Sequence, residues 1–406
     1  MRLIHINSTY NKGSTGKIVF DIHNLLKEQK IPSKVFYGRF KKSDDDDKSI
    51  HFFGGKVNNF FHFFLSRFFD LHGRGSIFYT YSLIKKIKKF KPDIIHLHNI
   101  HGYYLNYPIL FDFLNLSKIK TVWTFHDAWP FTGHCAYFDF SNCNKWKTQC
   151  SKCPELKSYP KSLGIDNSYH NYNLKKIKFT SLDSDQLTIV SPSKWLKENI
   201  NLSFLSKFKS IVINNGINLS VFKPTLSSFR TKYNLKNSFL ILGVAKPWTR
   251  RKGLNFFIEL SRLVPNNFKI ILVGLDVKQI RDIPSTILSI PTITNSKELA
   301  EIYSSVDVFI NPTLEDNFPT TNLESLACGT PVITFDTGGC GEVVNKSNGL
   351  VLKNKNTEDL YLAIKEISNK PKAFYKENCI KTIEDNFDKN IRYLDYLNLY
   401  KDILNK

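Results

Sequence analysis

"PTLEDNFPTTNLESLACGTPVITFD", residues 312–336, predicts a turn, a short helix and a buried strand in immediate succession. The Phe-Pro-Thr-Thr segment is typical of a turn, the residues from Thr321 onward suit a helix, and Gly329 is placed to end that helix. Residues 331–335 are mostly apolar and β-branched, as expected of a strand. A helix that runs directly into a buried strand is characteristic of parallel α/β sheets.

The same alternation extends over the whole chain, where short β-branched runs are separated by longer helical patterns. We expect strands at residues 3–6, 34–37, 93–98, 121–125 and 187–190, one that ends at Asn214, and a second set at 239–244, 269–273, 288–290, 308–311 and 331–335. A chain of 406 residues is too long for one ordinary core. The sequence therefore predicts an α/β protein with two doubly wound, Rossmann-like domains, 1–215 and 216–388, facing each other across a ligand-binding cleft. A C-terminal helix, 389–406, is expected to pack back on the first domain.

The net charge of +21 indicates a polyanionic partner, either nucleic acid or an anionic membrane surface. The basic residues are dispersed over both halves without a nucleic-acid recognition motif, so we expect no nucleic acid. No run of about 18 uncharged apolar residues occurs, and the N-terminus has polar residues where a signal peptide needs an apolar stretch. We therefore expect a cytoplasmic protein.

A phenylalanine-rich segment at residues 52–69, "FFGGKVNNFFHFFLSRFF", carries only two charges, Lys56 and Arg67. Its pairs of phenylalanines recur at near-helical spacing. Such a helix is typical either of a membrane interface or of an amphipathic helix buried in a large core. The first alternative predicts peripheral attachment to the inner face of the cytoplasmic membrane.

Four of the seven cysteines fall between residues 135 and 153. In a cytoplasmic protein, a cluster that ends in C-x-x-C indicates a metal more often than disulfides. Cys135, Cys143, Cys150 and Cys153 could therefore hold a structural zinc ion in a closed tetrahedral site. The first two spacings match no standard zinc finger, so four ordinary thiols are the alternative.

A loop that follows the first strand has the composition of an anion site. Gly13 and Gly16 flank Ser14 and Thr15 directly before a helix, where free backbone amides and close approach favour an anion. The loop lacks the glycine spacing of Rossmann NAD sites and of P-loop ATP sites. A tight turn without a ligand is the alternative.

A second loop, after the expected strand at 239–244, carries Lys246, Arg250, Arg251 and Lys252. Adjacent cations repel one another unless water or an anion separates them, and a diphosphate would relieve that repulsion. A solvated run of charges is the alternative.

Three acidic residues surround the turn of the opening stretch: Glu315, Asp316 and Glu324. Thr321 and Glu324 have the spacing of a capping box, so Glu324 could close the first turn of its own helix. Alternatively, the turn brings Asp316 and Glu324 to one helix N-terminus. There, paired carboxylates could accept hydrogen bonds from sugar hydroxyls, and the helix amides could bind a phosphate.

These motifs resemble those of the retaining glycosyltransferases of family 4, which have the two-domain GT-B fold. The most specific piece is "EDNFPTTNLESLACGTPVI", similar to the family's E-(seven residues)-E segment and its "LEAMACGTPVI" continuation. The pieces "INNGINLSVFKP", "RRKG" and "TGGCGEVV" also match. The longer piece "HDAWPFTGHCAYFDFSNCNKWKTQCSKCPELKSYPKS" looks like a subgroup associated with bacterial surface-polysaccharide assembly.

The resemblance implies roles in the second domain. Glu324 would hold the ribose hydroxyls of a UDP- or GDP-sugar, and Lys252 with Lys246 or Arg251 would neutralise the diphosphate. Backbone amides of the turn would bind the sugar and the β-phosphate; this turn consists of Asn317, Phe318, Pro319, Thr320 and Thr321. Asp316 stands where the family has its first glutamate and Glu315 precedes it, so either carboxylate could contact the donor sugar.

In the first domain, Gly16 matches the glycine loop that closes over the diphosphate. His126 matches the histidine that faces the donor sugar, and a buried histidine bonded to Asp127 is its alternative. The histidines of "HLHNIHGYY" are expected on the acceptor side; they are His96, His98 and His101.

Together these features predict transfer of a sugar from a nucleotide diphosphate donor to a lipid-linked or oligosaccharide acceptor, with retention and without a catalytic metal or cofactor. The expected product is a capsule, O-antigen or exopolysaccharide precursor. The residues expected to be catalytic are His126, Lys252, Asp316 and Glu324. Two alternatives are a sugar-nucleotide epimerase of the same fold, which needs no acceptor, and a basic nucleic-acid-binding protein.

Overall fold

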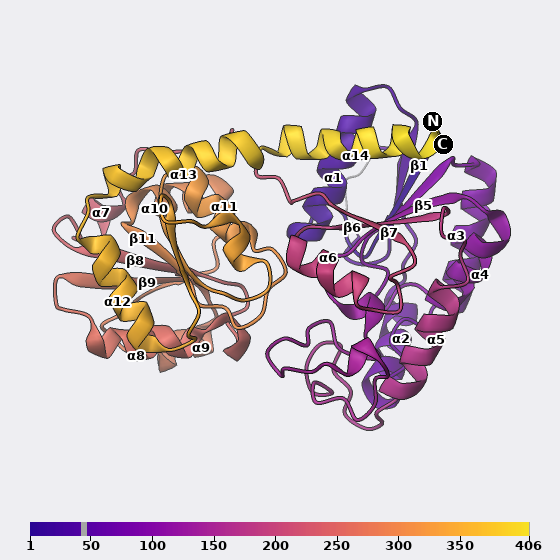
Figure 1. The fold of residues 1–406 in the computed structure, drawn as a ribbon, viewed down its shortest axis with the longest axis horizontal. Helices are drawn as coiled ribbons and strands as arrows, with labels where there is room; N and C mark the ends of the chain where they lie inside the picture. Colours follow the sequence, from indigo (N-terminus) through magenta and orange to yellow (C-terminus); the bar gives the residue numbers. More distant parts are fainter. Residues whose placement is uncertain (42–46, 406) are drawn as a thin grey trace. The chain divides into compact units, whose positions relative to one another are not determined.

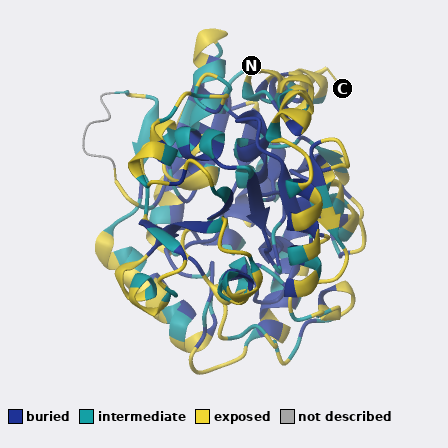
Figure 2. Ribbon diagram, turned by 90° about the vertical axis from the view of Figure 1, so that its left-hand side faces the viewer, coloured by how far each residue is buried: buried dark blue, intermediate teal, exposed yellow. Residues whose placement is uncertain are grey.

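The computed structural model describes residues 1–41 and 47–405. They form two compact units: unit 1 consists of Met1–Asn214 with Tyr393–Lys406, and unit 2 of Asn215–Arg392. Each unit has its own parallel sheet between helices (Figure 1). Most residues of the central strands are buried, whereas the helices expose their outer faces to solvent (Figure 2).

Unit 1 contains a seven-stranded sheet in the order β3-β2-β1-β4-β5-β6-β7. All neighbouring strands are parallel, and β1 and β4 are in register with His5 opposite His96. The strands of unit 1 are β1 (Leu3–Asn7), β2 (Ser33–Tyr37), β3 (Ile50–Phe52), β4 (Ile94–Leu97), β5 (Lys120–Thr124), β6 (Leu187–Ser191) and β7 (Lys209–Val212).

Every residue of β1 is buried, including His5 and Asn7, because helices cover both faces of a parallel sheet. The helices of unit 1 are α1 (Gly13–Glu28), α2 (Lys56–Phe69), α3 (Ile77–Phe90), α4 (Tyr107–Ser117), α5 (Ser168–Phe179) and α6 (Lys194–Asn201), with the short 3₁₀ helices η1 (Trp129–Phe131) and η2 (Lys145–Lys147).

The last helix, α14 (Lys389–Leu404), returns the chain to unit 1 from Tyr393 onward. Tyr393, Tyr396 and Tyr400 recur at helical spacing and are buried in one apolar cluster with Leu3 and Ile18. The return of the C-terminal helix to the first half of the chain is therefore as expected from the aromatic pattern.

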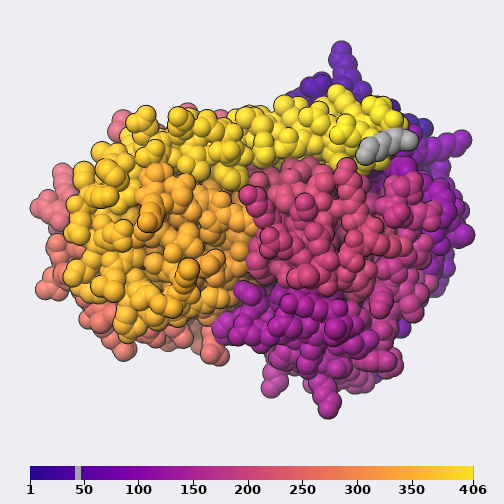
Figure 3. Space-filling model, viewed as in Figure 1, coloured from indigo at the N-terminus to yellow at the C-terminus, as the bar shows by residue number. Residues whose placement is uncertain are grey.

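Unit 2 contains a six-stranded parallel sheet in the order β10-β9-β8-β11-β12-β13. Its strands are β8 (Phe239–Val244), β9 (Phe268–Leu275), β10 (Leu288–Pro291), β11 (Val308–Asn311), β12 (Val332–Phe335) and β13 (Gly349–Leu352). Its helices are α7 (Phe229–Lys232), α8 (Leu254–Leu263), α9 (Val277–Asp282), α10 (Ser296–Ser305), α11 (Thr320–Ala327), α12 (Thr357–Ser368) and α13 (Lys372–Asn386), with η3 (Arg250–Lys252) and η4 (Cys340–Val343). Helix α13 lies at the surface of unit 2 (yellow in Figure 3).

The predicted fold class is confirmed: both halves are doubly wound α/β units. The expected strands are present within a few residues, and the strand expected to end at Asn214 ends at Val212. β3 and β13 were not expected; both are short strands at a sheet edge, where sequence patterning is weak.

The structure decides between the two alternatives for the phenylalanine-rich segment. The two buried residues of helix α2 are polar, His62 and Ser66, whereas six of its phenylalanines are between 37% and 69% exposed. The exposed residues, called the aromatic band below, are Phe60, Phe61, Phe63, Phe64, Phe68 and Phe69. The alternative of a buried amphipathic core helix is therefore wrong.

Candidate active site

In unit 2 the sheet order changes direction between β8 and β11, because β9 and β10 lie on one side and β12 and β13 on the other. The loops that leave the C-terminal ends of β8 and β11 contain the predicted cations and the predicted acids. In doubly wound sheets, ligands bind beside the ends of the strands at this switch point. Parallel pairing thus brings the two halves of the expected donor site to one place.

Gly253 lies where these two loops pack closely against each other. Its φ is +76°, and a Cβ atom there would lie 2.2 Å from the carbonyl oxygen of Pro312. The carbonyl oxygen of Arg251 accepts hydrogen bonds from the Leu314 backbone N–H at 2.8 Å and from the Thr313 hydroxyl at 3.2 Å. Backbone contacts therefore fix where η3 presents its side chains.

An ion pair links the two loops. The Lys252 Nζ lies 2.5 Å from Asp316 Oδ2. Burial raises the pKa of Asp316, but Lys252 and Arg251 outweigh it and hold this pKa below its ordinary value. The alternative of a fully solvated charge run is therefore wrong for Lys252. Lys246, by contrast, is exposed and has no ion pair with any described residue.

The two neighbouring acids are placed differently. Asp316 directs its carboxylate to Lys252, whereas Glu315 is only 6% exposed and its backbone oxygen accepts from Arg251 at 2.5 Å. Gly338, whose φ is +55°, packs so closely that an added Cβ atom would lie 1.8 Å from the Asp316 carbonyl oxygen. The glycine pair of "TGGCGEVV" thus supports the backbone of Asp316, a role that the spacing alone did not predict.

Helix α11 begins at Thr320, its N-cap residue is Pro319, and no side chain caps it. The capping-box alternative for Thr321 and Glu324 is therefore wrong. Glu324 Oε2 instead accepts a hydrogen bond from the hydroxyl of Tyr303 at 3.2 Å. Tyr303 was missed by the sequence analysis, because it lies on α10 and only folding brings it to Glu324.

The turn before α11 turns most of its side chains inward. Asn317 and Phe318 are buried, and Phe318 belongs to the apolar core of unit 2. Thr320 and Thr321 are partly exposed at the first helical positions. What this turn can offer a ligand is therefore backbone N–H groups, as expected, together with two hydroxyls.

In unit 1 the switch point lies between β1 and β4. The loop after β1 leads into α1, whose N-cap Lys12 makes no side-chain capping bond. Gly13 is exposed with open space around it, whereas Gly16 is buried and an added Cβ atom would lie 2.8 Å from Thr9 Oγ1. Gly13 can thus admit a ligand, while Gly16 serves the packing of the loop itself.

His126 follows β5, and its Nε2 lies 3.3 Å from Nδ1 of His98. Burial lowers the pKa of His126 to about 4, so its imidazole is neutral at pH 7. The carboxylate of Asp127 is bonded to His101 Nε2 at 2.9 Å, and Nδ1 of His101 lies 3.1 Å from the Tyr159 hydroxyl. The hydrogen bond suggested between His126 and Asp127 is replaced by one between His101 and Asp127.

His96 lies deeper than expected for a residue that contacts an acceptor. It is fully buried, with its nitrogens 2.7 Å from the hydroxyl of Tyr400 and 2.8 Å from that of Thr124. His5, which the sequence analysis did not select, is its register partner, with the two ring centroids 5.1 Å apart. His5, His96 and His98 are the one group of described residues in which three potential metal-ligand atoms lie within 4.8 Å of one another.

The four clustered cysteines lie outside both switch points, in the loop between η1 and α5, and line a single pocket. All four are free thiols.

Comparison with known proteins agrees with this geometry. Residues 15–221 match the family described as Glycosyltransferase Family 4, and residues 236–370 match Glycosyl transferases group 1. The chain is 23% identical, over 86% of each sequence, to the putative colanic acid biosynthesis glycosyl transferase WcaC of Escherichia coli K12. It is 26% identical over 50% of this chain and 57% of the N,N'-diacetylbacillosaminyl-diphospho-undecaprenol alpha-1,3-N-acetylgalactosaminyltransferase of Campylobacter jejuni. The fold also superposes on Anabaena HepE in complex with UDP, with a TM-score of 0.65, 14% identity and coverage of 99% and 100% of the two chains.

Proposed function

The chain belongs to glycosyltransferase family 4, and from this premise we propose that it transfers a sugar, with retention, from a nucleotide diphosphate donor to a lipid-linked or oligosaccharide acceptor. The product would be a precursor of a bacterial capsule, O-antigen or exopolysaccharide. The names of the Escherichia coli and Campylobacter relatives support a surface-polysaccharide role and a lipid-linked acceptor.

The observation that carries this proposal is the Lys252–Asp316 pair beside the uncapped N-terminus of α11, at the switch point of unit 2. As the bond between sugar and phosphate breaks, the leaving diphosphate gains negative charge. The Lys252 ammonium and the backbone N–H groups of Thr320 and Thr321 are fixed beforehand, so they stabilise that charge without reorganisation. The departing phosphate takes the proton of the acceptor hydroxyl, and neither a covalent carboxylate intermediate nor a catalytic metal is required.

The resemblance to family 4 assigns the remaining donor contacts to Asp316 and Glu324 of unit 2 and to His126 of unit 1. Asp316 is held ionised, so it can accept a hydrogen bond from a hydroxyl of the donor sugar. Glu324, held by Tyr303, would accept hydrogen bonds from the ribose hydroxyls. His126, neutral at pH 7, would hydrogen-bond a sugar hydroxyl without acting as a strong acid. The UDP bound to Anabaena HepE favours a UDP-sugar over a GDP-sugar.

We further propose that unit 1 attaches to the cytoplasmic face of the membrane through the aromatic band of α2. None of the described helices is long and apolar enough to cross a membrane. Hydrogen bonds on the buried face of α2 hold the helix that carries the band: His62 lies 2.8 Å from the Ser76 hydroxyl and accepts from the Gly73 N–H at 3.1 Å. Bulky apolar residues of α3 are exposed beside it, with Phe78 86% exposed.

Basic residues accompany the apolar ones, as an anionic bilayer requires. Helix α3 exposes four lysines along its C-terminal half, and Arg67 of α2 lies over the Phe63 ring at 5.5 Å from the ring centroid. Aromatic rings would enter the headgroup region while the cations contact the lipid phosphates. The lysines of α3 are Lys85, Lys86, Lys88 and Lys89.

The transferase proposal is tested with a panel of UDP- and GDP-sugars and a lipid-diphosphate acceptor, with the products identified by mass spectrometry. The expected result is one glycosylated acceptor whose anomeric configuration equals that of the donor. Conversion of the nucleotide sugar in the absence of acceptor would favour the epimerase, and inversion would contradict the retaining mechanism.

Membrane attachment is tested by flotation with vesicles that contain or lack anionic lipid. Binding is expected to require the anionic lipid and to weaken with salt, and the double variant Phe60→Ser, Phe61→Ser is expected to bind markedly less. Leu226→Ser is the matched control, because Leu226 is 99% exposed in unit 2. Equal flotation with neutral vesicles would refute an electrostatic contribution.

A further inference from the structure

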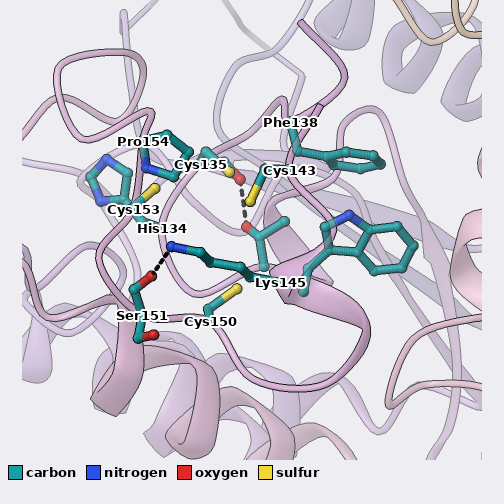
Figure 4. Close-up of a pocket in the computed structure, with 11 residues that line it drawn as sticks. His134, Cys135, Phe138, Cys143, Lys145, Cys150, Ser151, Cys153 and Pro154 are labelled. Atoms are coloured by element: carbon teal, nitrogen blue, oxygen red, sulfur yellow. Dashed lines mark hydrogen bonds between the residues drawn. The ribbon is translucent and has the colours of Figure 1, made fainter. Parts of the chain in front are cut away.

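The pocket in the loop between η1 and α5 brings together thiols that are far apart along that loop. Cys135, Cys143, Cys150 and Cys153 all line it, and Figure 4 shows their side chains around one space. His134 lines the same pocket. A pocket lined by four thiols has the donor set of a structural zinc site.

One of the sulfur atoms already accepts a backbone hydrogen bond. The Gly133 N–H donates to Cys150 Sγ at 3.2 Å. A hydrogen bond from a backbone amide stabilises a thiolate more than a thiol, because the thiolate carries the charge. This backbone contact therefore favours the metal-binding form of Cys150.

His134 is held as a group that supports such a site. Its side chain is fully buried, and Nδ1 lies 2.5 Å from Oδ1 of Asp70, whose other oxygen accepts from the Asn167 N–H at 2.9 Å. The other ring nitrogen, Nε2, is buried without a hydrogen-bond partner. A carboxylate-bonded ring whose second nitrogen has no partner is also the arrangement of a metal-binding histidine, but four thiols already fill a tetrahedral site, which leaves this ring to support them.

Two lysine side chains lie near the thiols, and burial lowers the pKa of one of them, Lys175, to about 7. Lys175, which is 1% exposed, donates to the carbonyl oxygens of Trp129 at 2.7 Å and Thr132 at 2.9 Å. Lys145 donates to the carbonyl oxygen of Ser151 at 2.9 Å (Figure 4). A zinc ion with four thiolates carries a net charge of −2, and cations beside it reduce the free-energy cost of burying that charge. Four neutral thiols would need no such neighbours.

We propose that this pocket binds one Zn²⁺ through Cys135, Cys143, Cys150 and Cys153, with His134 donating from Nε2 to a bound thiolate rather than binding the metal. Binding displaces the four thiol protons. The sulfur atoms must move closer together, since no three of them in the described chain lie within 4.8 Å of one another. Rotation of the four side chains around the shared pocket would bring the sulfur atoms together. This site is independent of the transferase proposal.

The histidine group of unit 1 is a poorer metal site despite its closer spacing. Both nitrogens of His96 are already bonded to hydroxyls. Among the described residues, the charged neighbours that act on His5, His96 and His98 are other histidines, so nothing there would offset a buried dication.

The metal would fix the loop that begins after Asp127 and carries Tyr159. Asp127 and Tyr159 both contact His101. Residues beside Cys135 make the connecting bonds: the Ala128 N–H donates to the Ala136 oxygen at 2.9 Å, and the Ala136 N–H donates to the Tyr159 oxygen at 3.1 Å. Zinc at Cys135 would therefore fix both partners of His101. The role of the zinc ion would therefore be structural, namely to hold these two residues in position.

The proposal is tested on the full-length protein by elemental analysis and X-ray absorption. We expect about one zinc per chain, four Zn–S distances near 2.3 Å and no Zn–N distance near 2.0 Å. Cys150→Ser is expected to lose the metal, whereas Cys379→Ala, which changes a buried cysteine of α13, keeps it. His134→Gln should keep four sulfur ligands with an affinity about 10- to 100-fold weaker. Protein that takes up no zinc after incubation with equimolar Zn²⁺ would overturn the site, and a Zn–N distance that disappears in His134→Gln would overturn the ligand set.

A second measurement does not depend on variants that fold. In the zinc-loaded wild type, iodoacetamide is expected to leave the four cysteines unmodified until a chelator is added. Chelation should also raise hydrogen exchange in residues 128–136. Alkylation at the same rate with and without zinc would contradict the proposal.

Discussion

The two units present their polar residues in opposite ways. All eleven histidines of the chain lie in unit 1, where most are buried, whereas unit 2 contains none. The candidate site of unit 2 is built from ionised groups, Lys252, Asp316 and Glu324, that pair with one another or with a tyrosine. In unit 1, burial instead lowers the pKa of several imidazoles, among them His5 and His62. The difference indicates that unit 2 is organised to stabilise charge and unit 1 to hold neutral hydrogen-bonding groups in fixed positions.

The largest expected difference between the units is in their response to acid. Burial lowers the pKa of His5 and of His62 to about 3, from an ordinary value of 6.5. Below pH 6.5 the unfolded chain binds protons that the folded chain excludes, so the stability of unit 1 is full above that pH and falls as the pH is lowered toward 3. At pH 5, each of these two histidines lowers the free energy of unfolding by about 2 kcal/mol, so that together they lower it by about 4 kcal/mol.

Unit 2 should not share this loss. Its Asp316 has a lowered pKa, so its contribution is present above 3.8 and is lost only below that value. Hydrogen exchange at pH 7 and pH 5, corrected for intrinsic rates, should show β4 losing protection while β8 keeps it. Equal loss in both strands would remove the contrast between the units.

The second prediction concerns Lys252, the cation at the centre of the unit 2 site. Lys252→Met is expected to lower kcat/KM by about 100- to 1000-fold, because it removes a fixed positive charge from the leaving diphosphate. Steady-state kinetics, with the donor that the panel of nucleotide sugars identifies, will measure this decrease. Lys236→Met is the matched control: Lys236 is exposed and lies just before β8, at the opposite end of that strand. A similar loss in the control would show that overall charge, and not the site, is responsible.

Glu324→Gln tests whether the Glu324 carboxylate contacts the donor, because the structure excludes a capping role for this residue. Charged hydrogen bonds of this kind contribute about 1.5 to 3 kcal/mol, so kcat/KM should fall about 10- to 150-fold with an unchanged melting temperature. Tyr303→Phe, which removes the hydroxyl that contacts Glu324, should give a smaller decrease. Wild-type kinetics in a folded Glu324→Gln protein would mean that this carboxylate does not contact the donor.

The smallest expected effect separates Asp316 from Glu315. Asp316→Asn should lower kcat/KM about 10-fold, because the amide no longer pairs with Lys252 or accepts hydroxyl bonds as strongly. Glu315→Gln should change it by less than about 3-fold, since we assign the donor sugar to Asp316, whose carboxylate pairs with Lys252. The reverse order would assign the donor sugar to Glu315.

The sequence by itself determined the two-sheet α/β fold and identified candidate residues for the unit 2 site, because strands, turns and the acids around them are neighbours along the chain. Apolar runs report burial wherever they occur, and the loops after β8 and β11 can be identified from local composition. Helix α2 shows the limit of this reasoning: a phenylalanine-rich helix is compatible with either a core or a surface, and only packing of His62 beneath it decided the question.

Only the tertiary structure decided which side chains contact one another. Tyr303 reaches Glu324 from another helix, His5 reaches His96 from a neighbouring strand, and Asp70 reaches His134 across 64 residues of sequence. Such contacts depend on strand order and on side-chain direction, which the alternation of apolar and polar residues along one segment does not encode. For the same reason the cysteine spacing indicated a metal, but the charges that would make a buried tetrathiolate tolerable, Lys175 and His134, became visible only when the loop was folded.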